Sequence, residues 1–392
     1  MSVSKKISSL SFNKTILLHK IQLFIHIIST IIDYLIPKDD NLVIIGSNTG
    51  EFKSGSPKAL FEYITKNHPS TKVQYYLPFQ EKSIIKIIKY ICYHSVSFYR
   101  CKFLISSHPP NDFFPFMWSQ KKILINTWHG TPIKSLFFTD KKETSVSLSR
   151  IKYLNKKTNY FITSSEIEKK IIKKCFDIDP NKIIITGHPR NDGIIQNNHL
   201  LRDKYKINSA YIILYCPTYR RGTNTKYFPF KEFNIQYFKD YLEKNDITVL
   251  IRNHVYDKTE VQKITSDRLI YFGSDVCDDI YEVLSQVDLL ITDYSSIFID
   301  FLLLNKPCIF IPYDLEEYLE ERGLLFNYEK VISGEIIKSY KELTDIITQY
   351  KTKKIDDYLK KRLIMKDIFH TNQNHNASQM VYNIIIKGEN IK

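Results

Sequence analysis

Residues 289–300 read Leu-Leu-Ile-Thr-Asp-Tyr-Ser-Ser-Ile-Phe-Ile-Asp, and this stretch carries the strongest indication of the fold. Its first four residues form a run of the length expected for a buried strand, and a second apolar run begins at Ile297. Ser295 and Ser296 stand where a helix would start, so their hydroxyls either cap that helix or, with its free N–H groups, bind a phosphate. The stretch, with Asp293 at its bend, predicts one strand-to-helix turn of a parallel α/β sheet.

The same alternation of short apolar runs and amphipathic stretches extends along the chain, as is typical of βαβ units. A chain of 392 residues is too long for one core, because single cores stop growing at roughly 250 to 300 residues. We therefore expect two α/β units, residues 39–205 and 206–392, preceded by an N-terminal segment of residues 1–38 and joined through a polar linker at 196–209. The predicted strands are residues 42–46, 73–77, 103–107, 123–127, 160–163, 183–186, 211–216, 248–251, 269–272, 289–292 and 308–312.

Composition indicates a globular protein that attracts polyanions. Hydrophobic residues make up 43% of the chain, and its formal net charge is +14. The lysines are dispersed and no nucleic-acid-binding module is recognisable, which favours a phosphate-rich substrate or an anionic membrane surface over nucleic acid. The six cysteines form no C-x-x-C pair, so they indicate reduced cytoplasmic thiols rather than a zinc site or a disulfide framework.

Residues 14–36 predict an N-terminal amphipathic helix. Polar residues, among them His26, Ser29 and Asp33, recur every three or four positions in a segment rich in Ile, Leu and Phe, and Pro37 ends it. The polar residues argue against a helix that spans a bilayer. Two interpretations remain open: a helix that lies on an anionic membrane surface, and a helix that packs on the domain behind it.

Polar clusters follow the predicted strands, where ligands of open α/β sheets bind. Two facing sheets would therefore place these clusters in one cleft, and their residues are the candidates for catalysis and substrate binding. The candidates are His129, Gly130 and Thr131 after one strand; Arg190, Asn191 and Asp192 after another; and Pro217, Thr218 and Arg220, then Arg252 and His254, then Asp293, Ser295 and Ser296 after three more.

Histidines and arginines in these clusters suit phosphoryl-type transfer. His129, at a tight glycine turn, could take a proton from an attacking hydroxyl, because histidine titrates near neutral pH. Paired guanidinium groups near Arg220 suit a diphosphate, and His254 could neutralise a leaving phosphate. The alternatives are a histidine satisfied by the backbone and a solvated turn. P-loop, nucleophile-elbow and zinc-protease motifs are absent from the sequence, which argues against a typical NTPase, serine hydrolase or zinc enzyme. Asp278-Asp279 is not framed as a metal-binding D-x-D motif at a strand end, so no metal is expected, and no cofactor is expected either.

At these residues the sequence resembles the CDP-glycerol glycerophosphotransferase family, which comprises teichoic-acid primases and polymerases and related capsule polymerases. The order and spacing of the motifs hold over residues 40–335. The resemblance implies a GT-B fold of two facing Rossmann-like domains, with the acceptor side first and the CDP-donor side second, and essential histidines at His129 and His254. The matching motifs are SGSPKAL at 54–60, NTWHGTPIK at 126–134, GHPRND at 187–192, LYCPTYR at 214–220, RNH at 252–254, ITDYSS at 291–296 and YDLE at 313–316.

The resemblance also implies a reaction and its setting. His129 would deprotonate an acceptor hydroxyl, which attacks CDP-glycerol and releases CMP, while Arg220, Arg252, His254 and the serines hold the diphosphate. The acceptor would be a lipid-linked or polymeric polyol phosphate of a teichoic acid or capsule, at the cytoplasmic face of a bacterial membrane. A CDP-ribitol or nucleotide-sugar donor remains an alternative, as does a polyanion-binding protein without turnover.

Overall fold

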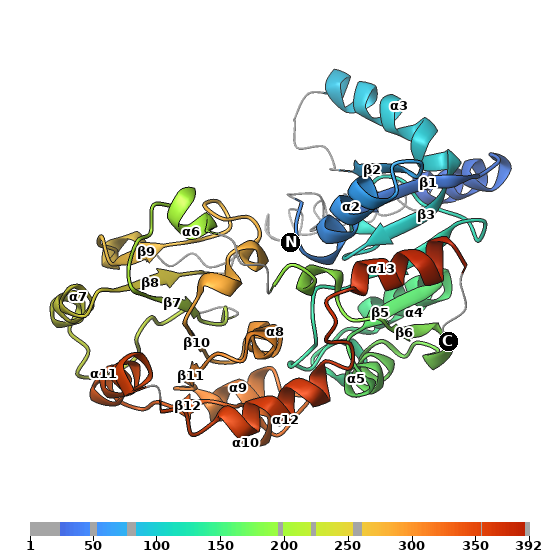
Figure 1. Ribbon diagram of the computed structural model, residues 1–392. Helices are drawn as coiled ribbons and strands as arrows, with labels where there is room; N and C mark the ends of the chain where they lie inside the picture. Colours follow the sequence, from blue (N-terminus) through green and yellow to red (C-terminus); the bar gives the residue numbers. More distant parts are fainter. Residues whose placement is uncertain are drawn as a thin grey trace, which may run out of the picture.

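The protein contains two six-stranded sheets, each entirely parallel (Figure 1). The computed structural model describes residues 24–47, 53–76, 84–194, 199–220, 225–253, 261–353 and 355–388. The first sheet has the order β2-β1-β3-β4-β5-β6 and the second the order β12-β11-β10-β7-β8-β9. The strand order reverses between β1 and β3 in the first sheet and between β7 and β10 in the second. At such a reversal a crevice opens at the carboxyl ends of the strands.

The first sheet is built from residues 39–185. Its strands are β1 (Asp39–Gly46), β2 (Lys72–Tyr76), β3 (Cys101–Ser106), β4 (Ile123–Asn126), β5 (Tyr160–Thr163) and β6 (Ile183–Ile185). The connecting helices are α2 (Gly55–Asn67), α3 (Ile84–Arg100), α4 (Ser145–Lys157) and α5 (Glu166–Phe176). Val43, Ile45, Ile105 and Ile125 are fully buried, as expected for parallel strands covered on both faces.

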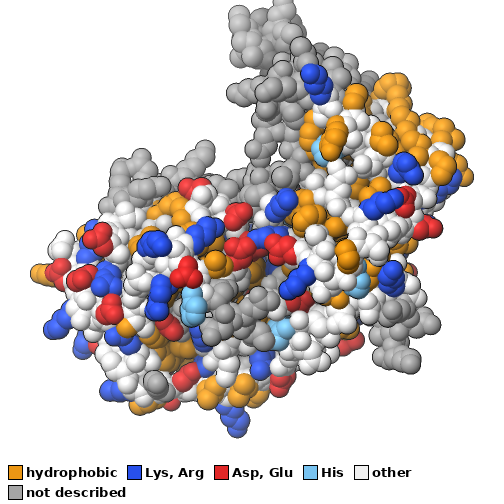
Figure 2. All heavy atoms as spheres, turned by 45° about the horizontal axis from the view of Figure 1, so that its top comes forward, with side chains coloured by type: hydrophobic (Ala, Val, Ile, Leu, Met, Phe, Trp, Pro, Cys, Tyr) orange, Lys and Arg blue, Asp and Glu red, His pale blue; other side chains and the backbone are white. Residues whose placement is uncertain are grey.

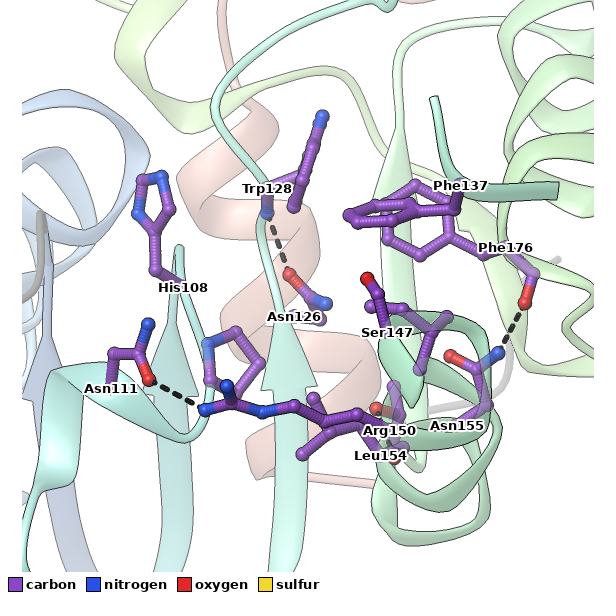
Figure 3. A pocket seen from close by; sticks show the side chains of 13 residues that line it. His108, Asn111, Asn126, Trp128, Phe137, Ser147, Arg150, Leu154, Asn155 and Phe176 are labelled. Atoms are coloured by element: carbon purple, nitrogen blue, oxygen red, sulfur yellow. Dashed lines mark hydrogen bonds between the residues drawn. The ribbon is translucent and has the colours of Figure 1, made fainter. Parts of the chain in front are cut away.

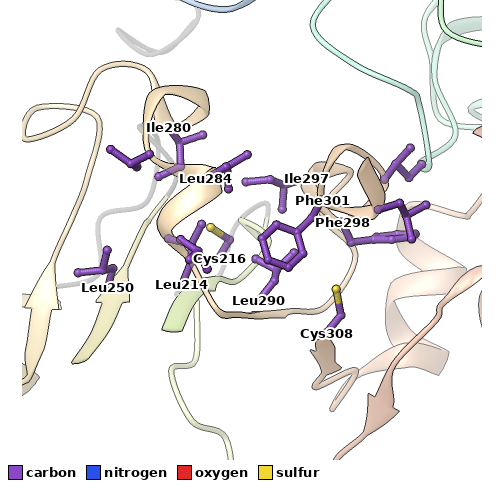
Figure 4. Close-up of a cluster of buried hydrophobic side chains, with 14 of the residues drawn as sticks. Leu214, Cys216, Leu250, Ile280, Leu284, Leu290, Ile297, Phe298, Phe301 and Cys308 are labelled. Carbon is purple, nitrogen blue, oxygen red and sulfur yellow. The ribbon is translucent and has the colours of Figure 1, made fainter. Parts of the chain in front are cut away.

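The second sheet follows a short helix, α6 (Leu200–Asp203), within the predicted linker. Its strands are β7 (Tyr211–Cys216), β8 (Ile247–Ile251), β9 (Leu269–Tyr271), β10 (Leu289–Thr292), β11 (Cys308–Phe310) and β12 (Glu335–Ile336). The helices are α7 (Ile235–Lys244), α8 (Ile297–Phe301), α9 (Leu315–Glu321), α10 (Tyr328–Val331), α11 (Tyr340–Thr348), α12 (Leu359–Phe369) and α13 (Ala377–Val381). Side chains of α8 pack over β7 and β10 in one of its two core layers (Figure 4).

The end of the chain returns to the first sheet. Val381, Tyr382 and Ile385 belong to the buried cluster that contains Val43 and Leu60 of that sheet. In Figure 1 the red helix α13 accordingly lies among the elements of the first half. The sequence predicts that residues 206–392 belong to the second unit, whereas residues 381–385 pack on the first sheet.

The described part of the N-terminal segment is helical over residues 24–35, and its polar side faces the protein. Asp33 is 0% exposed, and its carboxylate pairs with Lys122 at 2.9 Å and Lys38 at 3.1 Å. It also accepts hydrogen bonds from the backbone and hydroxyl of Ser119. Ser29 exchanges hydrogen bonds with the backbone of Met117. These contacts fix the helix on the first sheet's domain; residues 14–23 of the predicted helix lie outside the described residues.

The apolar side of this helix is left open. Ile31 is 54% and Leu35 70% exposed, and the exposed apolar side chains of the helix are Phe24, Ile25, Ile27, Ile28, Ile31, Ile32, Tyr34 and Leu35. Figure 2 shows hydrophobic side chains gathered at the upper right, at the edge of the lobe where this helix lies. Among the described helices, none has the length and hydropathy needed to cross a bilayer. We call this surface the apolar helix face.

Candidate active site

A cavity of about 220 Å³ lies between the two sheets, and both contribute to its walls. We call it the interdomain cavity. From the first sheet come the start of α2 and the loops after β3, β4 and β6; from the second come the loops after β8 and β9. The residues that line it are Ser54, Gly55, Ser56, Pro57, Ser107, Trp128, His129, Arg190, Arg252, Asp278, Asp279, Ile280 and Tyr281.

His129 is presented to this cavity by a strained turn after β4. Trp128 has φ 50° and Gly130 has φ 130°, so the backbone reverses sharply on both sides of the histidine. The imidazole is exposed, and it stacks on the ring of His108 with centroids 4.7 Å apart and planes 4° apart. Its own sheet therefore fixes the ring, while Arg252 reaches the same cavity from the opposite sheet.

His108 gives His129 a neighbour of low basicity. Desolvation lowers the pKa of His108, although the nearby carboxylate of Asp112 opposes this change. Asp112 accepts hydrogen bonds from the backbone N–H groups of Ser107 and His108 and so holds their loop. A neutral ring beside His129 adds no positive charge that would oppose protonation of the His129 imidazole.

Arg190 joins the two halves of the protein beneath His129. It is buried, and it donates from Nη1 to the carbonyl of His129 at 2.6 Å and from Nη2 to Asp300 at 2.6 Å. Asp300 also accepts from Asn191 at 2.9 Å and from the Tyr281 hydroxyl at 2.7 Å. Burial alone would raise the pKa of Asp300, but the Arg190 cation, with smaller contributions from His188, His370 and the Asn191 hydrogen bond, holds that pKa below its ordinary value. Arg190 and Asn191 thus support the turn of His129 from below.

A second contact between the halves closes the cavity at α2. The backbone N–H of Gly55, in the first turn of that helix, donates to Asp279 Oδ2 at 2.9 Å. Lys58 forms an ion pair with Glu282. Burial raises the pKa of Asp279, opposed by its hydrogen bond from Gly55 and by the charge of Lys58. The loop of residues 278–282 is therefore a wall of the site supplied by the second unit.

Among the candidates of the second sheet, Arg252 lines the interdomain cavity and Arg220 does not. Arg252 is partly exposed and anchored by donation to the carbonyl of Cys277 at 2.7 Å. Arg220 is buried and bound to Asp314 at 2.7 Å and Asp293 at 2.9 Å. Both carboxylates bind the guanidinium group that the sequence pattern predicts to hold the diphosphate, so that role for Arg220 stays a prediction.

The remaining candidates mostly hold loops together. Asp293 accepts from the backbone N–H of Thr218 at 2.8 Å, next to buried Pro217. Ser295 and Ser296 are half-buried at the start of α8, and Ser296 makes no side-chain capping bond. These residues do not line the interdomain cavity formed by the described residues. Their substrate contacts stay predictions.

The structure describes two further candidates of the first unit, Asp192 and Thr131, but not His254 of the second unit. Asp192 accepts from the backbone N–H groups of Ala377 and Ser378 at 2.8 and 2.7 Å, and so caps α13. Thr131 is buried, and its hydroxyl has no hydrogen-bond partner among the described residues. His254 lies outside the described residues, as does Leu77 of a predicted strand.

The sequence matches the family model described as CDP-Glycerol:Poly(glycerophosphate) glycerophosphotransferase over residues 28–387. The chain belongs to this family. Membership confirms the family and the transferase activity expected from the motifs.

Curated relatives and solved structures support this membership. The teichoic acid glycerol-phosphate transferase of Staphylococcus aureus (strain NCTC 8325 / PS 47) is 27% identical over 88% of this chain and 93% of its own length. The teichoic acid poly(glycerol phosphate) polymerase of Bacillus subtilis (strain 168) is 29% identical over 80% of this chain, which spans only 44% of that polymerase. The wall teichoic acid polymerase TagF superposes with a TM-score of 0.70 at 21% identity, over 99% of this chain and 98% of that one. This likeness confirms the α/β fold with two parallel sheets.

Several residues of the cavity in this glycerophosphotransferase were not among the candidates. His108, Asp278, Asp279 and Tyr281 contact or line the site. His108 follows directly after a predicted strand, so the rule that selected His129 would also have found it. The loop at 278–281 follows β9 after a gap of several residues, and its contact with Gly55 links positions 224 apart in the sequence. Strand position alone could not reveal that contact.

Gly130 offers a direct test of the turn that presents His129. A Cβ at this position would lie 2.6 Å from Nη2 of Arg190, and φ is 130°. We expect Gly130→Ala to cost about 1–3 kcal/mol of local strain and to lower CMP release at least tenfold. Gly388→Ala is the control, because Gly388 has φ 71° with no atom within 4 Å of its Cβ position. Equal activity of the two variants would contradict a requirement for glycine at this turn.

Proposed function

We propose that this glycerophosphotransferase moves glycerol phosphate from CDP-glycerol to a hydroxyl of a teichoic-acid-like or capsular polymer. The observation that carries the proposal is the meeting of His129 and Arg252, from opposite sheets, in one cavity. A base on one wall and a cation on the other suit attack by an acceptor hydroxyl on a phosphate held by the second unit.

The positions of His129 and Arg252 support one chemical step. His129 accepts the proton of the acceptor hydroxyl, whose oxygen forms a bond to the β-phosphorus of CDP-glycerol. The bond from that phosphorus to the bridging oxygen breaks, and CMP leaves with the electron pair. Arg252 balances the charge that develops on the phosphates, and His254 is assigned the same task from the sequence. We infer a GT-B arrangement, with the acceptor on the first unit and the donor on the second.

A panel of activated donors tests this function. The purified chain is incubated with a polyol-phosphate acceptor and CDP-glycerol, CDP-ribitol or a UDP-sugar, and free nucleotide is measured. We expect CMP from CDP-glycerol. CMP from CDP-ribitol alone would assign the alternative polyol, and release only from a UDP-sugar would refute polyol-phosphate transfer. Salt-sensitive binding of arbitrary polyanions without turnover would instead support a binding protein.

We further propose that the apolar helix face rests on the anionic inner surface of the bacterial membrane. A soluble surface helix normally turns its apolar side inward, whereas this helix buries Ser29 and Asp33 and exposes its isoleucines. The net charge of +14 adds attraction to anionic lipid. A helix that is fixed by its polar side can enter the headgroup region without losing its packing on the domain.

Vesicle binding tests the proposed membrane contact. Ile27→Asp combined with Ile31→Asp should reduce co-sedimentation with phosphatidylcholine–phosphatidylglycerol vesicles about tenfold or more, because two charges would enter the apolar boundary. Tyr237→Asp, at a 68% exposed position on α7, is the matched control. Turnover of a soluble acceptor should be unchanged in both. Equal vesicle binding by the double variant and the wild-type chain would refute the membrane contact.

A further inference from the structure

A second cavity, of about 230 Å³, opens on the first unit beside the turn that carries His129 (Figure 3). We call it the side cavity. Trp128, Phe137 and Phe176 give it an aromatic wall, while Asn111 and Arg150 approach from the opposite side. Aromatic faces pack well against the C–H groups of a polyol, and the polar side suits a charged group.

The side cavity adjoins the interdomain cavity. Trp128 lines both cavities, and its ring lies 4.0 Å from that of His129 between centroids. His108 lines the side cavity and stacks on His129 at 4.7 Å. A chain molecule that occupied the side cavity would therefore place its next unit beside the imidazole of His129.

Arg150 supplies a positive charge that no carboxylate compensates within the described part of the chain. Its Nη2 donates to the amide oxygen of Asn111 at 3.1 Å, and its side chain is exposed. The helix that carries it, α4, has four cationic residues and no acidic one: Arg150, Lys152, Lys156 and Lys157. By contrast, Arg190 and Arg220 are each bound to aspartates. An exposed guanidinium group with a neutral partner is suited to a phosphate.

We propose that the side cavity binds the phosphodiester-linked unit next to the end of the acceptor polymer, with its phosphate on Arg150. The terminal hydroxyl then extends past Trp128 to His129. This inference rests on the proposed function, and it names the acceptor subsite and its ligand, a polyol phosphodiester. Arg150 therefore binds the acceptor and does not take part in binding the CDP-glycerol donor.

Tryptophan fluorescence measures binding directly, because the chain has only two tryptophans. Trp118 is 1% exposed in the core, whereas Trp128 lines the side cavity. We expect a synthetic tri(glycerol phosphate) to change the Trp128 signal in a saturable manner and Arg150→Ala to weaken its binding roughly tenfold. Lys152→Ala is the matched control: Lys152 lies on the same helix, pairs with Asp177 at 3.7 Å and does not line the cavity. It should bind like the wild type.

Steady-state kinetics test the proposed acceptor subsite independently of the fluorescence measurement. Arg150→Ala should raise the KM for the acceptor about tenfold and leave the KM for CDP-glycerol, and kcat at saturating acceptor, unchanged. Ser147→Tyr, which fills the cavity without removing charge, should have the same effect on acceptor KM. Three results would overturn the proposal: equal effects of Arg150→Ala and Lys152→Ala, no fluorescence response to the oligomer, or displacement of the oligomer by CMP alone. Absence of CMP release by the wild-type chain would refute the proposed function while the fluorescence experiment still tests the subsite.

Discussion

Replacing His129 by alanine is expected to lower the turnover measured as CMP release by about 10²–10⁴-fold. The exposed imidazole is the candidate base in a cavity shared by both sheets, and its removal leaves no group at that position to accept the proton of the acceptor. CDP-glycerol binding should persist, because Arg252 and the wall at residues 278–281 remain in place. CMP release and donor affinity, measured on the same preparation, check both expectations.

A control separates proton transfer from a general effect of losing a histidine. His199 is exposed and makes no capping bond to α6, so His199→Ala should retain wild-type turnover. His129→Gln should resemble His129→Ala, since an amide can donate and accept hydrogen bonds but cannot act as a base near neutral pH. Normal turnover in either His129 variant would remove this residue from the proposed role.

The strands could be predicted because each is a short run of buried apolar residues between polar loops. Residues 160–163, 211–216 and 289–292 were predicted with the bounds that the structure gives to β5, β7 and β10. The two-residue strand β12 (Glu335–Ile336) was missed, because so short a segment carries no periodicity. The convergence of His129 and Arg252 in one cavity was also expected, because each follows the carboxyl end of a strand and two facing sheets place those ends in one cleft.

Contacts between distant residues could not be predicted. Arg190 and Asp300 are 110 positions apart, and neither lies in a pattern that names the other. Arg220 looked like a phosphate ligand because the aspartates that bind it, Asp293 and Asp314, lie in other loops. The sequence pattern predicted that the helix of residues 24–35 is amphipathic, but it did not show which side is buried. Only the partners of Asp33 reveal that the polar side is buried.

Loss of the buried ion pair between Arg190 and Asp300 is expected to lower the free energy of unfolding strongly. Both side chains are buried, and Asp300→Asn would leave the guanidinium group beside a neutral amide. Breaking a buried pair from one side costs about 3–5 kcal/mol. We expect that loss in the free energy of unfolding measured with urea, together with reduced CMP release, because Arg190 also holds the carbonyl of His129.

Asp177→Asn provides the matched control for this change. Asp177 and Lys152 form a pair whose side chains are 60% and 59% exposed, so its loss should alter stability by less than about 1 kcal/mol. Asp177 has φ 54°, a conformation that asparagine also adopts readily. Equal unfolding free energies for Asp300→Asn and the wild-type chain would show that the pair does not join the two halves energetically.

The pH dependence distinguishes lost charge from lost packing. Because Arg190 holds the pKa of Asp300 below its ordinary value, the unfolded state takes up a proton at a higher pH than the folded state. The stabilisation is therefore complete at neutral pH and disappears as the pH falls through the lowered pKa of the folded state. Asp300→Asn should be destabilised most at neutral pH, and the difference from the wild type should shrink in acid. A difference that stayed constant with pH would assign the loss to packing, and the ion pair would no longer explain how the turn of His129 is held against the second unit.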